Sequence, residues 1–492
     1  MTYLSKQLHN SLNLYFELSV MEEKFEQFDL ENNSDEMISR YELMLRTNRH
    51  SFFDVHEFES IIDYYLFRNQ PAKALKVSDL SLDQHPNSIE LQLKRASVLY
   101  DSGKYIDALR LITGLQKIES SNADLFILKG NIYLTLDQPD QAVKTFNIAL
   151  SLDSEDKDET CYAIALSFVQ ARKYNLSMDF LYLGLEYNPD HAEIMYELAF
   201  LYEKEGKMEK SIEYYKKYLE INPFAEDAWY NLGVAYDKLD MSEEAIDAFE
   251  YALAVDPEFY SAHYNLANCH MDLERFDKAL DCFFQILEVD GQAPEVLTCM
   301  GECYEKLNDT ETAEKYYRLT LDTDCQYPDA WYGLSVLAYN CSNWADSLKF
   351  IRKAIKIDKE NTEYWFTLAR ISKKLDMITD AESSYIQAVQ IDPYDDEIWL
   401  DYATMMYEQG KLNETEKILV DALSCNQKIA ELNYRLAALY VELDCNDRAI
   451  DYVKKGMECD KTKLHYFYEF YPPQIDITIF DDVINDFYEK LK

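Results

Sequence analysis

The chain has 492 residues, of which 91 are acidic and 48 are basic, so its formal net charge is −43. Binding to nucleic acids requires lysine and arginine to neutralise phosphates, so this charge argues against nucleic-acid partners and favours basic ones. Hydrophobic residues make up 48% of the chain, which is enough for a core, yet no stretch approaches the roughly 18 apolar residues of a transmembrane helix, and we expect no membrane insertion.

The N-terminal segment begins MTYLSKQLHN and lacks the long apolar region of a secretory signal. The ten cysteines occur at uneven spacings, and without a secretory signal we expect them to be reduced thiols in a cytoplasmic protein. Apolar residues at helical spacing predict one helix within residues 2–30 and a second through Ile38, Tyr41 and Leu45. Residues 1–54 are therefore expected to form a helical cap or a degenerate repeat over the helices that follow.

Between residues 55 and 463 the sequence repeats twelve times, with ten start-to-start spacings of 34 residues and one of 35. The repeats start at Val55, Ile89, Ala123, Asp158, Ala192, Glu226, Tyr260, Pro294, Pro328, Thr362, Asp396 and Ala430. Within each repeat, apolar residues recur at i, i+3, i+4 and i+7, which predicts amphipathic helices. No repeat can bury its apolar face alone, so neighbouring repeats are expected to stack around one continuous core.

The clearest repeat reads EDAWYNLGVAYDKLDMSEEAIDAFEYALAVDPEF and starts at Glu226, which we number position 1. It has Trp at position 4, Leu at 7, Gly at 8, Tyr at 11, Ala at 20, Phe at 24, Ala at 27 and Pro at 32. This spacing resembles the tetratricopeptide repeat family, and the resemblance covers residues 55–463. It implies an all-α fold, an α-α superhelix (a solenoid) of about twelve helical hairpins, each with a helix A followed by a helix B. The right-handedness of the superhelix is likewise implied by the resemblance.

Residues 464–492 are expected to form C-terminal capping helices. Pro472 and Pro473 end a short aromatic helix, and apolar residues at helical spacing between Phe480 and Leu491 mark a last amphipathic one. A cap is expected because the terminal repeat of a solenoid must cover its apolar face. The alternative is that this segment is a detachable helix that docks on a partner.

In the family that the sequence resembles, helix A lines a concave groove, chiefly through positions 2, 5, 9 and 12. Position 5 is tyrosine in four successive repeats, and tyrosine suits peptide recognition because it offers rigid apolar area together with a hydroxyl. The alternative is that these rings only pack on the adjacent repeat. The aromatic and amide candidates for the groove are Tyr162, Tyr196, Phe200, Tyr230, Tyr264, Asn268, Tyr332 and Phe366.

Carboxylates recur on the same predicted helices. Position 2 is acidic in ten repeats, which the dipole at the start of helix A can explain. Glu203, Asp237, Glu302 and Glu305 come late in helix A, where the dipole disfavours anions, so they predict an acidic wall of the groove. Solvated carboxylates without a role are the alternative.

Other chemistries fit the sequence poorly. Family members that grip a carboxylate do so with lysine and arginine, and here only Arg370 and Lys373 put positive charge in the groove. Cys299 and Cys303 share a helix face, but a metal would need two further ligands, so packing is the simpler interpretation. No glycine-rich phosphate loop, HExxH or GxSxG motif occurs. We therefore expect no catalysis, no cofactor and no bound metal.

Taken together, these features predict a non-catalytic protein–protein interaction scaffold or adaptor. Its acidic, tyrosine-lined groove is expected to bind a basic protein segment that carries an apolar or aromatic anchor. The alternative is an auxiliary or regulatory subunit of an enzyme complex, which docks through its convex face or its C-terminal helix. A groove binder should capture isolated peptides, whereas a docking subunit should bind only a folded partner.

Overall fold

The computed structural model describes residues 37–47, 50–153, 156–290, 293–426 and 428–469, together with residue 480. Regular structure in these ranges is entirely helical, which confirms the expected all-α class. The chain divides into two compact units, Met1–Ala235 (unit 1) and Tyr236–Lys492 (unit 2), and each is described by itself. The helix predicted within 2–30 and the last predicted helix, apart from Phe480, lie outside the described residues.

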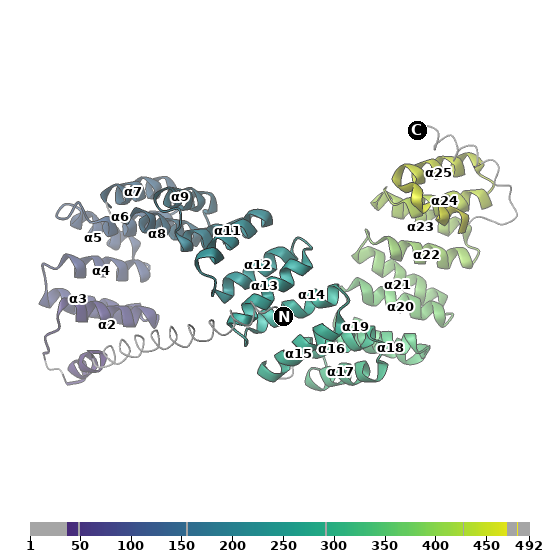
Figure 1. The fold of residues 1–492 in the computed structure, drawn as a ribbon, viewed down its shortest axis with the longest axis horizontal. Helices are drawn as coiled ribbons and strands as arrows, with labels where there is room; N and C mark the ends of the chain where they lie inside the picture. Colours follow the sequence, from purple (N-terminus) through teal and green to yellow (C-terminus); the bar gives the residue numbers. More distant parts are fainter. Residues whose placement is uncertain are drawn as a thin grey trace, which may run out of the picture. The chain divides into compact units, whose positions relative to one another are not determined.

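Unit 1 is a stack of helical hairpins with one hairpin for each sequence repeat, and the two helices of a hairpin pack against each other (Figure 1). The hairpins are formed by α2 (Val55–Phe67) and α3 (Pro71–Gln84), α4 (Ile89–Asp101) and α5 (Tyr105–Leu115), α6 (Ala123–Thr135) and α7 (Pro139–Leu152), α8 (Lys157–Gln170) and α9 (Tyr174–Tyr187), and α10 (Ala192–Lys204) and α11 (Met208–Ile221). The next helix, α12 (Glu226–Asp237), contributes residues to both units.

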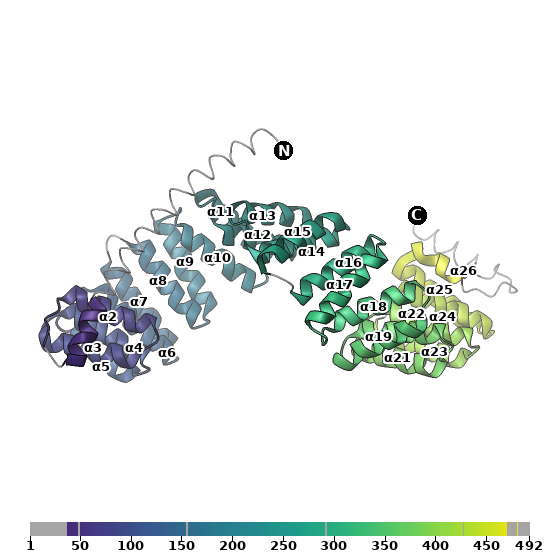
Figure 2. The ribbon, with the colours of Figure 1, turned by 90° about the horizontal axis from the view of Figure 1, so that it is seen from below.

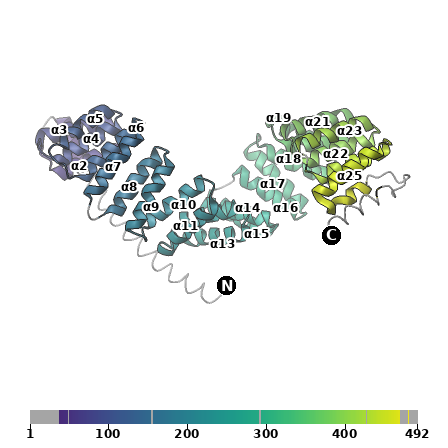
Figure 3. The same ribbon diagram turned by 90° about the horizontal axis from the view of Figure 1, so that it is seen from above.

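Unit 2 continues the same A–B alternation, and Figures 2 and 3 show its hairpins from two further directions. Its helices are α13 (Ser242–Val255), α14 (Tyr260–Asp272), α15 (Phe276–Asp290), α16 (Pro294–Lys306), α17 (Thr310–Thr323), α18 (Pro328–Asn340), α19 (Trp344–Ile357), α20 (Thr362–Lys374), α21 (Ile378–Ile391), α22 (Asp396–Glu408), α23 (Leu412–Cys425), α24 (Ala430–Glu442) and α25 (Asn446–Asp460), followed by the 3-10 turn η1 (Lys461–Leu464) and α26 (His465–Glu469). Each unit is thus an α-α solenoid.

One backbone conformation closes the turn between helices A and B in all twelve repeats. Position 15 always has a positive φ, from 54° at Asn69 to 74° at Gly103, and it is glycine in only three repeats. A side chain in this left-handed region costs roughly 1–2 kcal/mol, whereas glycine adopts it freely. The recurrence follows the register of the sequence repeat, so the turn geometry is a property of the repeat and not of any one residue.

Arg172 is exposed and occupies position 15 with a φ of 55°. We expect Arg172→Gly to raise the free energy of unfolding by about 0.5–1 kcal/mol, because the relief of strain exceeds the larger entropy that glycine gives the unfolded chain. Urea unfolding measures the change. The reverse substitution at the equivalent position, Gly206→Arg, should lower the free energy of unfolding by a similar amount. If neither substitution changed the free energy of unfolding, the proposed backbone strain at position 15 would be wrong.

A recurring hydrogen bond ties neighbouring repeats together. The indole N–H of Trp229, at position 4, donates to the carbonyl oxygen of Pro223, at position 32 of the preceding repeat, over 2.8 Å. Trp399 and Pro393 make the same bond at 3.0 Å. It recurs from Trp331 to the carbonyl of Cys325 and from Trp365 to that of Lys359. Tryptophan at position 4 therefore fixes one hairpin to the next as well as adding apolar area.

The core explains why position 8 is small. The aromatic ring at position 24 of helix B lies over position 8 of the same repeat, and a Cβ atom added to Gly301 would come within 2.7 Å of the Tyr317 ring. A Cβ atom on Gly130 would overlap the ring of Phe146. Both rings are buried. Helix B thus crosses helix A at position 8.

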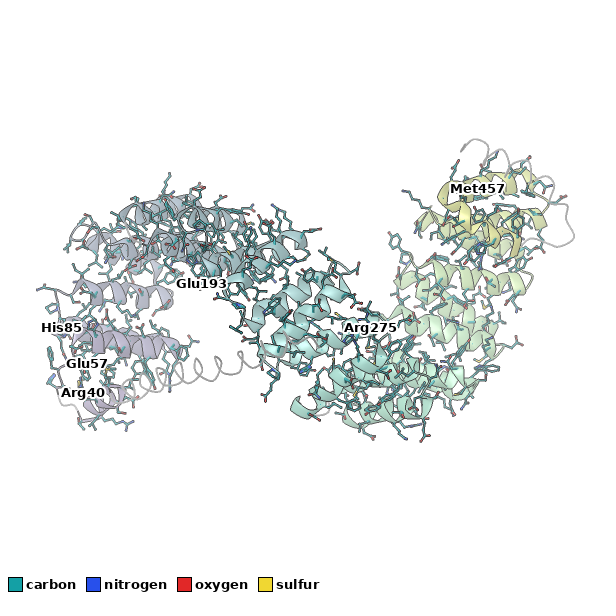
Figure 4. All side chains as sticks on the ribbon, viewed as in Figure 1. Arg40, Glu57, His85, Glu193, Arg275 and Met457 are labelled. Atoms are coloured by element: carbon teal, nitrogen blue, oxygen red, sulfur yellow. The ribbon has the colours of Figure 1, made fainter. Side chains whose placement is uncertain are left out.

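At the N-terminal end, residues 37–47 are helical and pack on the first hairpin. Ile38, Tyr41 and Met44 are buried, while Leu45, expected on the same face, is 59% exposed. The side chain of Arg40 forms an ion pair at 2.6 Å with that of Glu57, which lies on α2, and Figure 4 labels both residues.

At the C-terminal end, α26 packs on α24. The rings of Phe467 and Phe480 are both buried, with centroids 5.1 Å apart. The cap roles of the two ends remain predictions.

Candidate functional site

Each of the three position-5 tyrosines of unit 1 is packed on one side and exposed on another. Tyr162, Tyr196 and Tyr230, on α8, α10 and α12, are each half-buried. The ring of Tyr196 makes edge contacts with Tyr215 and Tyr218 of α11, at centroid distances of 5.6 and 5.2 Å. Its hydroxyl accepts a hydrogen bond from the side-chain amide of Asn231 in the next repeat, at 2.9 Å. Packing on its own hairpin and a hydrogen bond from the next repeat therefore leave part of the Tyr196 ring exposed.

In unit 2, Tyr264 and Tyr332 are half-buried, and Tyr332 donates a hydrogen bond to Glu363 Oε1 at 3.0 Å. Phe366, expected on the same surface, is only 4% exposed and belongs to the core. Its ring lies 6.2 Å from that of Tyr385, and the guanidinium of Arg370 lies over it at 5.4 Å. Neighbours on both sides thus remove Phe366 from the accessible surface.

Position 9 supplies Phe200 and Asn268, which are both half-buried. The ammonium of Lys204 lies 4.9 Å from the centre of the Phe200 ring, a cation–π contact. Aromatic rings on these helix faces therefore already attract a positive charge within the chain.

The four carboxylates of the predicted acidic wall differ in burial. Glu203 and Glu305 are half-buried, whereas Asp237 and Glu302 are exposed. Desolvation raises the pKa of Glu302, and the positive charge of Lys306 offsets only part of that rise. The side chain is still open to solvent, so it has lost only part of its hydration. Desolvation also raises the pKa of Glu305, although its hydrogen bond from the Tyr317 hydroxyl at 3.1 Å acts in the opposite direction.

These raised pKa values show that Glu302 and Glu305 are ionised at some cost. The charge of Lys306 acts on both carboxylates but does not cancel the effect of burial. A partly desolvated carboxylate is stabilised when a further cation arrives. The surface of unit 2 is therefore suited to basic groups.

Unit 1 contains a pocket of about 350 Å³ lined by residues of α8, α10, α11 and α12, a size typical of ligand-binding pockets. Glu193 of α10, labelled in Figure 4, is one of its lining residues, and its carboxylate lies 3.2 Å from Nδ1 of the buried His191. We call this the tyrosine pocket; it is lined by Tyr162, Glu193, Tyr196, Tyr218, Ala225, Glu226, Asp227 and Ala228.

Tyr218 lines the pocket but is not among the residues predicted from the sequence, although the sequence holds a signal for it. Position 27 is Ala, Gly, Ser or Thr in nine of the twelve repeats, and Tyr218 is the only aromatic residue found there. The other two large residues at position 27, Leu115 and Ile286, are buried, whereas Tyr218 is half-buried and lines the pocket. Its position lies outside the four that line the family's groove, so the family pattern gave no reason to examine it.

Glu197 was missed for the same reason. It lies on α10 beside Tyr196, is half-buried, and burial raises its pKa above the usual value of 4.5. Within the described part of the chain it has neither a hydrogen-bond partner nor an ion-pair partner. No cation that the structure describes offsets the effect of burial on Glu197, and its charge raises the pKa values of Tyr162 and Tyr196.

We expect Glu197→Gln to be more stable than the wild type at pH 7. The wild-type carboxylate is then ionised in both states and loses hydration on folding, whereas glutamine is neutral throughout. As the pH falls through the raised pKa, the folded wild type gains a proton, so the difference should shrink and vanish below about 4.5. Melting temperatures between pH 4 and 7 test this; a variant that is less stable at pH 7 would reveal a favourable partner of Glu197.

Several position-2 carboxylates do more than complement the helix dipole. Asp329 accepts a hydrogen bond from the hydroxyl of Tyr364, and Glu431 pairs with Lys463 at 3.0 Å. The side chains that could clamp a carboxylate are already engaged, since Arg370 lies on Phe366 and Lys373 pairs with Glu408 at 2.9 Å. A carboxylate clamp finds no support here.

Cys299 and Cys303 are neutral thiols in this structure. Burial raises the pKa of Cys299 to about 11 and that of Cys303 to about 12, so both thiols are protonated at neutral pH. Among the described residues, no group of three or more metal-binding side chains comes together.

Comparison with known families decides the identity of the repeats. Models of the tetratricopeptide repeat match residues 123–156, 192–224, 226–259, 260–292 and 362–395. The chain contains tetratricopeptide repeats. Such repeats are generally non-catalytic scaffolds for protein–protein interaction, so they indicate that the partners of this chain are proteins.

Solved structures with similar helices include the type IV pilus biogenesis factor PilW, at 20% identity over 42% of this chain and 96% of PilW, with a TM-score of 0.37. The Cut9–Hcn1 hetero-tetramer of the APC/C is 14% identical over 93% of this chain and 98% of the matched chain, with a TM-score of 0.38. PilF of Pseudomonas aeruginosa is 19% identical over 44% of this chain and 97% of its own, with a TM-score of 0.37. At such TM-scores nothing further follows from these similarities. No significant match is found among curated proteins.

The sequence predicts no membrane-spanning helix, and this prediction can be compared with the described helices. In the ranges that the structure describes, none of the helices combines the length and the apolar character needed to cross a bilayer.

Proposed function

We propose that this protein is a non-catalytic scaffold whose helix-A faces bind a basic protein segment carrying an apolar or aromatic anchor. In unit 1 the binding surface consists of Tyr162, Tyr196, Phe200, Glu203 and Tyr230. In unit 2 it consists of Asp237, Tyr264, Asn268, Glu302, Glu305 and Tyr332. Phe366 is left out because it is buried.

One observation carries the proposal: half-buried tyrosines share the helix-A faces with carboxylates whose pKa values are raised by burial. Tyrosine supplies apolar area at a low entropic cost, which suits it to anchor a bound side chain. The carboxylates attract a basic ligand, and the net charge of −43 extends that attraction over a longer range.

The alternative is docking through the helix-B side or the C-terminal segment. Apolar side chains are exposed on several B helices, among them Ile148 at 45% and Tyr251 at 56%. Single exposed apolar residues are normal on soluble proteins and need no partner to explain them. The groove proposal is therefore preferred.

The test begins with a pull-down from the native cell and identification of the captured protein by mass spectrometry. We expect Tyr230→Ala to weaken binding of that protein by about 2 kcal/mol, near thirtyfold, if Tyr230 is a central anchor. Charge reversal at Asp237 and Glu305 to lysine should slow association more than it speeds release, and raised salt should weaken binding. Stopped-flow or surface-binding kinetics measure both rates.

The matched control is Glu397→Gln, an exposed position-2 carboxylate that is not part of the proposed surface. It should leave the affinity unchanged. If Tyr230→Ala and the double charge reversal both fold normally and bind as the wild type does, the function lies on the helix-B side or in the C-terminal segment.

A further inference from the structure

The tyrosine pocket has a lining unlike that of the family's carboxylate clamp. Of its eight lining residues, three are tyrosines, three are carboxylates, two are alanines and none is basic. The three rings come from α8, α10 and α11, and the carboxylates come from α10 and α12. One small volume thus combines aromatic rings with negative charge.

Tyr218 stands at position 27, where most repeats have a small residue, and its ring lines the pocket. Tyr218 meets Tyr196 edge to face at 5.2 Å, and Tyr196 in turn rests on Tyr215, which is fully buried. The hydroxyl of Tyr196 is fixed by Asn231 at 2.9 Å. Packing on one side and a hydrogen bond at the tip hold the rings in place before any ligand binds, which reduces the entropic cost of binding.

Negative charge at the pocket exceeds the positive charge available nearby. Glu193, Glu226 and Asp227 line it, and the half-buried Glu197 adjoins Tyr196. The basic group beside them is His191, whose ring lies 5.6 Å from that of Tyr162 and whose nitrogens lie 3.2 and 3.4 Å from Glu193 and Glu159. A single histidine cannot balance these carboxylates, so the pocket favours a cationic occupant.

The distances between the carboxylates favour an organic cation over a metal ion. They do not converge closely enough to form a metal-binding group among the described residues. A large organic cation can contact carboxylates on two helices at once while it stacks on a ring. Guanidinium fits this best, because it is planar, stacks on aromatic faces and donates five hydrogen bonds in a fork, whereas ammonium is a compact and strongly hydrated point charge.

We propose that the tyrosine pocket receives the side chain of an arginine from the bound protein segment. Tyr196 and Tyr218 stack on its guanidinium, and Glu193 and Asp227 accept its hydrogen bonds. This inference rests on the proposed function and names the residue that the basic segment would present to unit 1.

The test uses three blocked hexapeptides of glycine and serine around one leucine, which differ only in a single arginine, lysine or citrulline. Saturation-transfer NMR titrations with the full chain suit weak ligands on a large protein. We expect the arginine peptide to bind about tenfold more tightly than the citrulline peptide, which is neutral but has nearly the same shape. The lysine peptide should fall between them. Equal binding of arginine and citrulline, or lysine binding as tightly as arginine, would overturn the proposal.

The decisive variant is Tyr218→Ala, because alanine occupies position 27 in five other repeats and the fold should tolerate it. It should weaken the arginine peptide about tenfold and leave the citrulline peptide unchanged. Tyr218→Phe keeps the ring and should retain binding. The control is Tyr187→Ala, an exposed tyrosine of α9 that does not line the pocket, and it should bind as the wild type does. Unchanged arginine binding in a folded Tyr218→Ala protein would refute the pocket.

The two proposals can fail separately. If the arginine peptide shows no preference but Tyr230→Ala and the charge reversal still weaken the captured partner, the pocket inference is wrong and the groove function stands. If arginine binding depends on Tyr218 but no groove variant affects the partner, the groove function is wrong and the pocket remains an arginine site.

Discussion

Replacing Tyr317 with alanine is expected to lower the free energy of unfolding by about 3–5 kcal/mol, the usual cost of deleting a large buried ring. The side chain is 2% exposed and lies against Gly301 of its own repeat and Gly333 of the next one. Both positions require glycine because the ring occupies the space that a Cβ atom would fill. The variant would therefore leave a cavity shared by two repeats, and urea unfolding measures the loss.

Tyr317→Phe is the matched control, since it keeps the ring and removes only the hydroxyl that donates to Glu305. It should cost about 1 kcal/mol. In a solenoid each repeat contacts only its neighbours, so hydrogen exchange in Tyr317→Ala should accelerate mainly in the repeats that start at Pro294 and Pro328. Uniform loosening of the whole chain would contradict this picture.

Introducing leucine at Gly130 is expected to destabilise unit 1 by about 1–3 kcal/mol, because even a Cβ atom there overlaps the buried ring of Phe146. The effect should lie at the upper end of that range, since helices α6 and α7 would have to separate. Thermal unfolding gives the shift. Gly114→Ala serves as the control, because a Cβ atom on Gly114 meets nothing within 4 Å, and this helical substitution should stabilise by about 0.5–1 kcal/mol.

The fold could be predicted from the sequence because the repeat imposes the same packing problem twelve times. Small residues at position 8 follow from the ring at position 24, and tryptophan at position 4 bonds to position 32 of the preceding repeat. The left-handed residue at position 15 was less evident, since Arg172 and Glu274 occupy it without any turn-forming preference. There the tertiary contacts of the hairpin impose a conformation that the residue alone would avoid.

The site could be predicted only in part, because aromatic residues at one register position differ in how far they are buried. Tyr196 and Tyr332 at position 5 are half-buried as expected, but Phe366 at that position is buried under Arg370. Periodicity fixes which face a side chain belongs to, and the neighbours decide whether it stays accessible. Tyr218 was recognisable only as a departure from the repeat's own small residue at position 27.

Hydrogen exchange of the full chain with and without the captured partner tests the central claim most directly, because it locates the bound surface without any substitution. The proposed function predicts protection concentrated in helices A, including α8, α10 and α12 around the tyrosine pocket and α14 and α16 in unit 2. Protection confined to helices B or to the segment after Lys463, with these five helices unchanged, would contradict it.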